Sequence, residues 1–195
     1  WHVWDNDPYP AFNNAFYEGT DLINCHSYKT FSMVSEKFPD KTNFVPHALP
    51  EDLFKPLPEN EVLEYKKKLL GENRLDHFVG IWIKRKRPND VLVSWKNFLD
   101  KLEEKHGHRK ATLIMHTDPN DQEGPNLYNT LEMLKINDNV MISPQRLEFP
   151  EMNILHNISD FCINIALNEG FGLTTLESMQ TGNPIIALKT GGLTR

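Results

Sequence analysis

Short apolar runs alternate with helical patterns along residues 58 to 195, and this alternation restricts the possible folds more than any other feature. Runs of strand length are expected at 77–83, 112–116, 140–143, 161–166 and 184–188. Helices are expected at 61–70, from a cap at Asn89-Asp90 onward, at 127–134, from Pro150 onward and at 173–180. Strands that alternate with helices form βαβ units, which need a parallel sheet with helices on both faces. The sequence therefore predicts an α/β fold with a Rossmann-like parallel sheet.

The loops after the five expected strands are the expected place for a ligand. In parallel α/β sheets, ligands bind at the carboxyl ends of the strands, near a change in strand order. The loops concerned are 84–87, 117–124, 144–149, 168–172 and 190–192. We expect all five loops to face one cleft.

Residues 168–180 combine a glycine-rich turn, a helix start and two acids. Gly170 and Gly172 allow a tight turn and a close approach of a ligand to the main chain. The helix expected from Leu173 begins at that turn, so its free N–H groups can bind a phosphate. Glu177 can accept both hydroxyls of a ribose diol, and Glu169 can reach a second polyol. The pattern favours a nucleotide-sugar site, although any doubly wound fold has glycine-rich turns before its helices.

The segment NEGFGLTTLESMQTGNPIIALKTGG, residues 168 to 192, resembles the donor-site signature of retaining family 4 glycosyltransferases. The resemblance covers most of residues 75–193 in order, and it implies the two-Rossmann-domain, B-type glycosyltransferase fold. In that family the second Glu, here Glu177, binds the ribose, while the first, here Glu169, contacts the transferred sugar as the catalytic residue. Amides around the Gly-Phe-Gly turn hold the diphosphate, so the expected donor-binding residues include Gly170, Phe171, Gly172, Leu173 and Thr174.

The resemblance also implies an activity and a domain division. The enzyme would move a hexose-like sugar from a nucleotide-diphosphate donor to an acceptor with retention of the anomeric configuration. The departing phosphate would take the acceptor's proton, and neither a metal ion nor another cofactor would be needed. Residues 58–195 would form the donor-binding domain, and residues 1–57 would be the end of the acceptor-side Rossmann domain with the crossing. The acceptor (glycan, lipid or protein) and the base and sugar of the donor stay open.

The densest basic run, residues 84–87, follows the first strand of the donor-binding part. Fixed cations at a strand's carboxyl end can neutralise a diphosphate and stabilise it as a leaving group. The family's lysine matches Lys86, whereas its arginine position falls on Ile81. Two explanations are open: Lys84 or Arg85 takes over that role, or a loop of the family is missing here. A solvated loop is the alternative.

Arg146 follows the third expected strand, where the family holds the base mainly through main-chain groups. A place beside the base and an ion pair with a nearby acid are both open for this side chain. His106 and His108 lie at a helix end without further ligands in register, so no metal site is expected there.

Composition and cysteine usage limit the partners and the compartment. A net charge of −6 argues against general binding to nucleic acid or to a bilayer surface, because both are anionic. No apolar run reaches the roughly 18 residues of a membrane span, and the first residues do not resemble a signal peptide. Cys25 and Cys162 are expected as buried free thiols, which suits a cytoplasmic protein.

Two other functions remain open on the sequence. A non-catalytic nucleotide-binding module would keep the donor site without transferring the sugar. A nucleotide-sugar epimerase on the same two-domain fold would isomerise or hydrolyse the donor without an acceptor.

Overall fold

The computed structural model describes residues 2, 4, 6–83, 86–121 and 124–194. The chain divides into two compact units. Unit 1 consists of Trp1–Leu49, Ala166–Leu173 and Ala187–Arg195, and unit 2 consists of Pro50–Ile165 and Thr174–Ile186. The division into an acceptor-side remnant (1–57) and a donor-binding domain (58–195) stays a prediction, because compactness does not show what each part binds.

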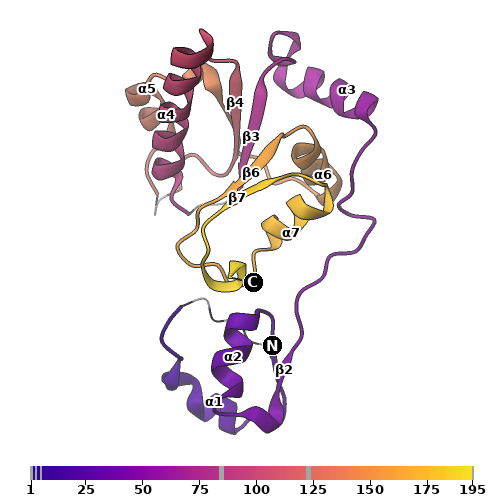
Figure 1. Ribbon diagram of the computed structural model, residues 1–195, viewed down its shortest axis with the longest axis vertical. Coiled ribbons are helices and arrows are strands. Elements are labelled where there is room, and N and C mark those ends of the chain that lie inside the picture. Colours follow the sequence, from indigo (N-terminus) through magenta and orange to yellow (C-terminus); the bar gives the residue numbers. More distant parts are fainter. Residues whose placement is uncertain (1, 3, 5, 84–85, 122–123, 195) are drawn as a thin grey trace. The chain divides into compact units, whose positions relative to one another are not determined.

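A five-stranded sheet forms the centre of unit 2 (Figure 1). Its strands are β3 (Phe78–Ile83), β4 (Ala111–His116), β5 (Val140–Ser143), β6 (Phe161–Asn164) and β7 (Ile185–Ala187), in the order β5-β4-β3-β6-β7. Parallel register joins Ile81 of β3 to both Ile114 and Cys162. The chain order reverses beside β3, which creates the change of strand order where α/β proteins bind ligands. The predicted fold class is confirmed.

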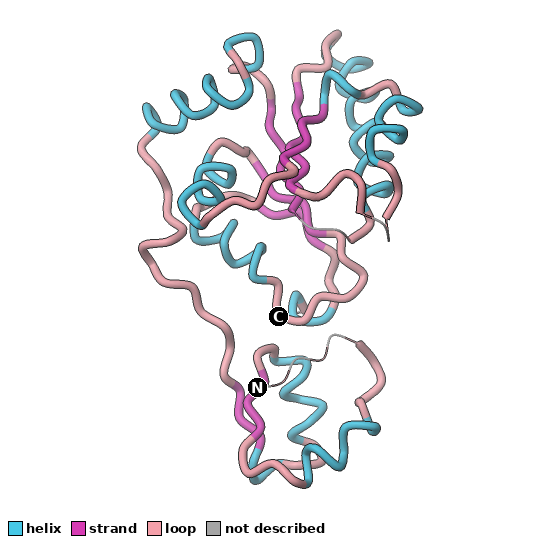
Figure 2. Tube along the Cα trace, turned by 180° about the vertical axis from the view of Figure 1, so that it is seen from behind, coloured by secondary structure: helices cyan, strands magenta, loops and turns pink. Residues whose placement is uncertain are grey.

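Helices lie on both faces of this sheet, as two opposite views show (Figure 1 and Figure 2). One side carries α4 (Pro88–His106) and α5 (Leu127–Leu134), and the other carries α3 (Glu59–Leu70), α6 (Phe149–Asn157) and most of α7 (Leu173–Gln180). This arrangement is the one that right-handed crossovers require. Along the sheet, the chain moves from β3 toward the β5 edge and later from β6 toward the β7 edge, so the connecting helices of the two halves lie on opposite faces. Among the described helices, none is long and apolar enough to cross a membrane.

An apolar stripe on α4 supplies much of the core of unit 2. Apolar residues that recur at helical spacing lie on one side of a helix, and here that side faces the sheet. The buried cluster includes Val91, Leu92, Trp95 and Leu99 of α4 with Trp82, Leu113 and Met115 of the sheet. The tryptophans Trp82 and Trp95 both belong to this core.

The start of α4 differs from the prediction. The expected cap at Asn89-Asp90 is wrong, because the helix already begins at Pro88. Arg87 precedes it in a left-handed conformation with φ 61°, and its Nε lies 2.6 Å from Asp90 Oδ2. Proline suits the first helical turn, where its missing N–H has no partner to lose.

An apolar pocket of about 680 Å³ lies over β6 and β7, beside α4. Its lining includes Trp95 and Phe98 of α4, Phe161 and Ile163 of β6, and Pro184 and Ile186 at β7.

Unit 1 contains two short parallel strands with a helix between them in sequence. β1 (Ile23–Cys25) pairs with β2 (Thr42–Phe44), and the helix between them is α2 (Tyr28–Ser35). Ser27 caps α2, since its Oγ accepts a hydrogen bond from the Thr30 N–H at 3.1 Å. The core of this unit consists of Tyr17 from α1 (Asn14–Glu18) with Ile23, Cys25 and Val34.

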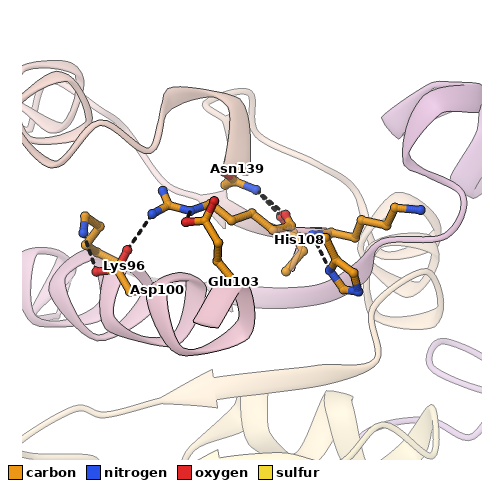
Figure 3. A network of polar contacts seen from close by, with 8 residues as sticks. Lys96, Asp100, Glu103, His108 and Asn139 are labelled. Atoms are coloured by element: carbon orange, nitrogen blue, oxygen red, sulfur yellow. Dashed lines mark hydrogen bonds and ion pairs between the residues drawn. The ribbon is translucent and has the colours of Figure 1, made fainter. Parts of the chain in front are cut away.

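A polar network joins the end of α4 to the beginning of β4 (Figure 3). Arg109 lies 2.7 Å from both Asp100 and Glu103 of α4. Asn139 Nδ2 donates to the main-chain oxygens of Arg109 and Ala111, each at 2.8 Å. Because β4 begins here, the network lies at the amino ends of the strands. It braces the sheet at the edge opposite to the expected ligand loops.

Candidate functional site

Strand pairing in unit 2 brings the ends of three strands to one edge. Ile83 of β3 is in register with His116 of β4, which is in register with Ser143 of β5. The loops that follow these strands therefore begin side by side. Loops 168–172 and 190–192 belong to unit 1 instead. The expectation that all five loops face one cleft stays a prediction.

Within unit 1, the loop 168–172 is held by the main chain of a single 3₁₀ turn, Gly191–Leu193. The Gly192 N–H donates to the main-chain oxygen of Glu169 at 2.6 Å. A Cβ on Gly191, which has φ 50°, would lie 1.9 Å from that same oxygen, and one on Gly192 would also overlap the loop's main chain. Only glycine fits at these two positions. Glu169 itself is buried, with 7% of its surface exposed.

The Phe171 side chain anchors the same loop. Its ring is buried and meets the His47 ring edge-on, with centroids 5.0 Å apart. His47 in turn stacks on His26 at 3.8 Å. Burial, together with the neighbouring His26, lowers the pKa of His47, so the neutral imidazole is favoured in this aromatic cluster.

Helix α7 begins directly after Gly172, whose φ of 88° is a conformation that suits glycine. Near its start, Thr175 Oγ1 accepts a hydrogen bond from Asn164 Nδ2 at 3.0 Å, which ties the helix to the end of β6. At its other end, the Asn183 N–H donates to Ser178 O at 2.9 Å. The contact with Asn164 thus attaches the start of α7 to the sheet, and the first-turn N–H groups of α7 stay the predicted phosphate site.

Glu177 projects from the middle of α7 toward α6. Its side chain is 16% exposed, and its Oε2 lies 3.5 Å from Nε2 of the fully buried His156. Helix α6 begins one residue before the expected Pro150, at a capping box formed by Glu148 and Glu151. Sequence reasoning did not single out His156, because a lone histidine in an apolar helix carries no signal of its own. Its contact with Glu177 arises only from the packing of α6 beside α7.

The expected cations are only partly placed by the structure. Lys84 and Arg85 lie outside the described residues. Ile81, at the position where the family has an arginine, is fully buried in the sheet. Lys86 is half-buried, and Arg146 is exposed after β5. No hydrogen bond or ion pair joins Arg146 to another part of the described chain, so the ion-pair alternative has no support there.

His116 stands at the carboxyl end of β4 with its Nδ1 3.1 Å from Ser143 Oγ. Burial lowers the pKa of His116, and the nearby His156 lowers it further. A neutral imidazole with one hydroxyl partner does not make a metal site. Within the ranges that the structure describes, no group of three or more His, Cys, Asp or Glu could hold a metal ion.

Comparison with protein-family models and with curated protein sequences gives no match. Solved structures do match. HepE from Anabaena, solved with UDP and glucose, has 18% identity and a TM-score of 0.71; the match covers 93% of this chain and 48% of HepE. A glycosyltransferase from Rickettsia africae has 19% identity and a TM-score of 0.72, covering 98% of this chain and 51% of that protein.

A third match concerns an isolated domain. The C-terminal domain of LpcC, a group 1 glycosyl transferase from Francisella tularensis, has 18% identity and a TM-score of 0.55, with 74% of this chain and 72% of that domain covered. The chain therefore has the B-type glycosyltransferase fold. It spans about half the length of HepE and of the Rickettsia protein.

Proposed function

We propose that this chain is the donor-binding part of a retaining glycosyltransferase that uses a nucleotide-diphosphate sugar. The observation that carries the proposal is the placement of Glu169 just before α7 and Glu177 within it, on a B-type glycosyltransferase fold. A fold alone does not select a function, whereas acids around a helix start suit the polyols and phosphates of such a donor. The presence of UDP and glucose in the HepE structure supports the same choice.

Each part of the donor has a proposed partner. Glu177 binds the ribose, Glu169 positions the transferred sugar, and the base lies near Arg146. The diphosphate is held by the main chain and by a basic loop: Gly170, Phe171, Gly172, Leu173 and Thr174 with Lys84, Arg85 and Lys86.

In the proposed reaction, the bond between the anomeric carbon and the diphosphate oxygen breaks as the acceptor oxygen forms its bond on the same face of the sugar. The departing phosphate takes the acceptor's proton, so no protein base is needed. Helix amides and basic side chains stabilise the charge that develops on the diphosphate. Neither a metal ion nor another cofactor takes part in this proposal, and the acceptor stays open.

Thermal stabilisation by nucleotides tests the donor site. A ligand that binds only the folded protein raises its melting temperature, so UDP, GDP, ADP and their common sugar conjugates should be compared. We expect one nucleotide to stabilise the protein and Glu177→Ala to weaken its binding by about 1–3 kcal/mol, the cost of losing hydrogen bonds to a charged group.

Glu104→Ala is the matched control, because Glu104 is an exposed acid on α4. It should respond to the nucleotide like the wild type. Equal stabilisation of Glu177→Ala and the wild type would contradict the ribose assignment. No stabilisation by any of these nucleotides would contradict donor binding by this chain.

Cys25 and Cys162 are buried thiols that form no disulfide in the described part of the chain, as the sequence indicated. Burial raises the pKa of the Cys25 thiol to about 11, so this residue is protonated and unreactive at neutral pH. Reduced thiols agree with a cytoplasmic location, which stays a proposal.

A further inference from the structure

His156 is a buried polar residue to which the proposed reaction gives no role. It lies near the end of α6 with none of its surface exposed. Neither ring nitrogen has a hydrogen-bond partner in the described part of the chain. An imidazole buried without partners costs free energy, which an apolar side chain of similar size at the same place would not.

The surroundings of His156 hold its backbone and orient its ring. Asn183 Nδ2 donates to the main-chain oxygen of His156 at 3.1 Å, which joins α6 to the turn after α7. The Phe54 ring stands edge-on to the imidazole, with centroids 5.9 Å apart. The ring is thereby confined, and the acidic partner that it meets is Glu177 on α7.

The contact between the two side chains is slightly longer than a hydrogen bond. His156 Nε2 and Glu177 Oε2 are 3.5 Å apart, whereas N–H···O bonds measure about 2.7–3.2 Å. Hydrogen bonds in binding sites are often long before the ligand arrives and shorten in the complex.

We propose that His156 is a positioning residue for Glu177. Its Nε2–H donates to one carboxylate oxygen, and the carboxylate is then fixed with its remaining lone pairs available to the ribose hydroxyls. Both the protonated imidazole and the neutral Nε2–H tautomer can donate in this way. The inference rests on the proposed role of Glu177 in ribose binding. The new element is that the affinity for the ribose diol depends on His156, which has no contact with the nucleotide itself.

The test separates the diol from the rest of the nucleotide. UDP and 2′,3′-dideoxy-UDP are titrated by calorimetry against the wild type, His156→Phe and His156→Gln, with the guanosine and adenosine pairs in parallel. Phenylalanine keeps the ring volume without a donor, whereas glutamine keeps an N–H donor. We expect His156→Phe to weaken UDP binding about tenfold, the size of one lost charge-assisted hydrogen bond, and His156→Gln to retain most of the affinity.

The dideoxy ligand decides whether His156 acts on the diol. Its affinity should be the same in all three proteins, because the groups that Glu177 would hold are missing. An equal loss of affinity for both ligands in His156→Phe would show general damage to the fold and overturn the inference. An unchanged affinity for UDP in that variant would also overturn it.

A second measurement needs no nucleotide. The ¹⁵N resonance of His156 Nε2 should shift when Glu177 is replaced by glutamine, while His108, an exposed histidine after α4, should not respond. A ring nitrogen that is insensitive to Glu177→Gln would overturn the positioning role. Failure of the proposed ribose binding can be told apart from failure of the His156 inference. In that case the wild type would bind UDP and 2′,3′-dideoxy-UDP equally, whatever the NMR result.

Discussion

Glu169 and Glu177 lie close together in sequence, yet different kinds of interaction place them. In unit 1, the main-chain oxygen of Glu169 accepts a hydrogen bond from the Gly192 N–H at 2.6 Å, and the same oxygen leaves no room for a Cβ on Gly191. We call this contact the main-chain clamp. In unit 2, the side chain of Glu177 faces a buried imidazole at 3.5 Å. A main-chain clamp tolerates almost no substitution, because any added atom overlaps it. A side-chain contact can be weakened by degrees.

Gly191→Ala should have the largest effect, because it adds both an overlap and backbone strain. The new methyl group would lie 1.9 Å from Glu169 O on a residue with φ 50°. Strain in the left-handed region and overpacking together should lower the free energy of unfolding by about 3 kcal/mol, measured by urea denaturation.

Gly107→Ala is the control for Gly191→Ala, because Gly107 has φ 73° and open space around its Cβ position. It carries the strain without the overlap, so its cost should be about 1 kcal/mol. Equal losses in the two variants would contradict the clamp.

Isosteric substitutions of the two acids should separate their roles. Glu177→Gln should lower the affinity for the stabilising nucleoside diphosphate and for its sugar conjugate by the same factor, about tenfold, since both contain the ribose. Glu169→Gln should lower only the affinity for the sugar conjugate. Calorimetric titration of both ligands measures the difference. A weaker affinity for the nucleoside diphosphate alone in Glu169→Gln would show that the two acids do not divide the donor in this way.

Thr175→Val should weaken the attachment of α7 by a moderate amount. The substitution removes the hydroxyl that accepts from Asn164 at 3.0 Å, and one such hydrogen bond contributes about 1 kcal/mol to stability. Thr175→Ser keeps the hydroxyl and should be close to the wild type in urea denaturation. If both variants lose the same stability, the hydrogen bond to Asn164 does not anchor the helix.

A pH effect should be the smallest and should involve a histidine in each region. Burial lowers the pKa values of His47 in unit 1 and His116 in unit 2 from their ordinary value of 6.5. Just below that value the unfolded chain binds more protons than the folded one, so the free energy of unfolding falls as the pH drops.

Urea denaturation at about pH 7.5 and pH 5.5 measures this loss of stability with acidification. Replacing His47 or His116 by glutamine should reduce the difference between the two pH values. A stability difference that is unchanged in both variants would contradict the burial of these imidazoles in their neutral form.

Much of the fold follows from local patterns in the sequence. The predicted limits of α5 and β5 agree with the structure, since α5 is a short amphipathic segment and β5 a short apolar one, each next to polar residues. The predicted cap of α4 fails because Arg87 adopts a left-handed conformation, which no residue pattern announced. The end of β6 at Asn164 is also earlier than the apolar run suggested, because the chain leaves the sheet while its sequence is still apolar.

The candidate site is less accessible to sequence reasoning. Glu169 and Glu177 stand out because acids, glycines and a helix start share one short segment. The sequence places Gly191 and Gly192 in an expected ligand loop, but their close approach to the Glu169 main chain is a distance that no sequence contains. His156 had no signal at all.

The sequence by itself determined the class of fold and the segment that carries the acids, because hydrophobic periodicity and turn chemistry act over a few neighbouring residues. Only the tertiary structure decided which side chains meet from distant segments. It brought His156 to Glu177, confined Gly191 against Glu169, and left an apolar pocket over β6 and β7. Such contacts depend on how helices pack on the sheet, and packing is a property of the whole chain rather than of any one stretch.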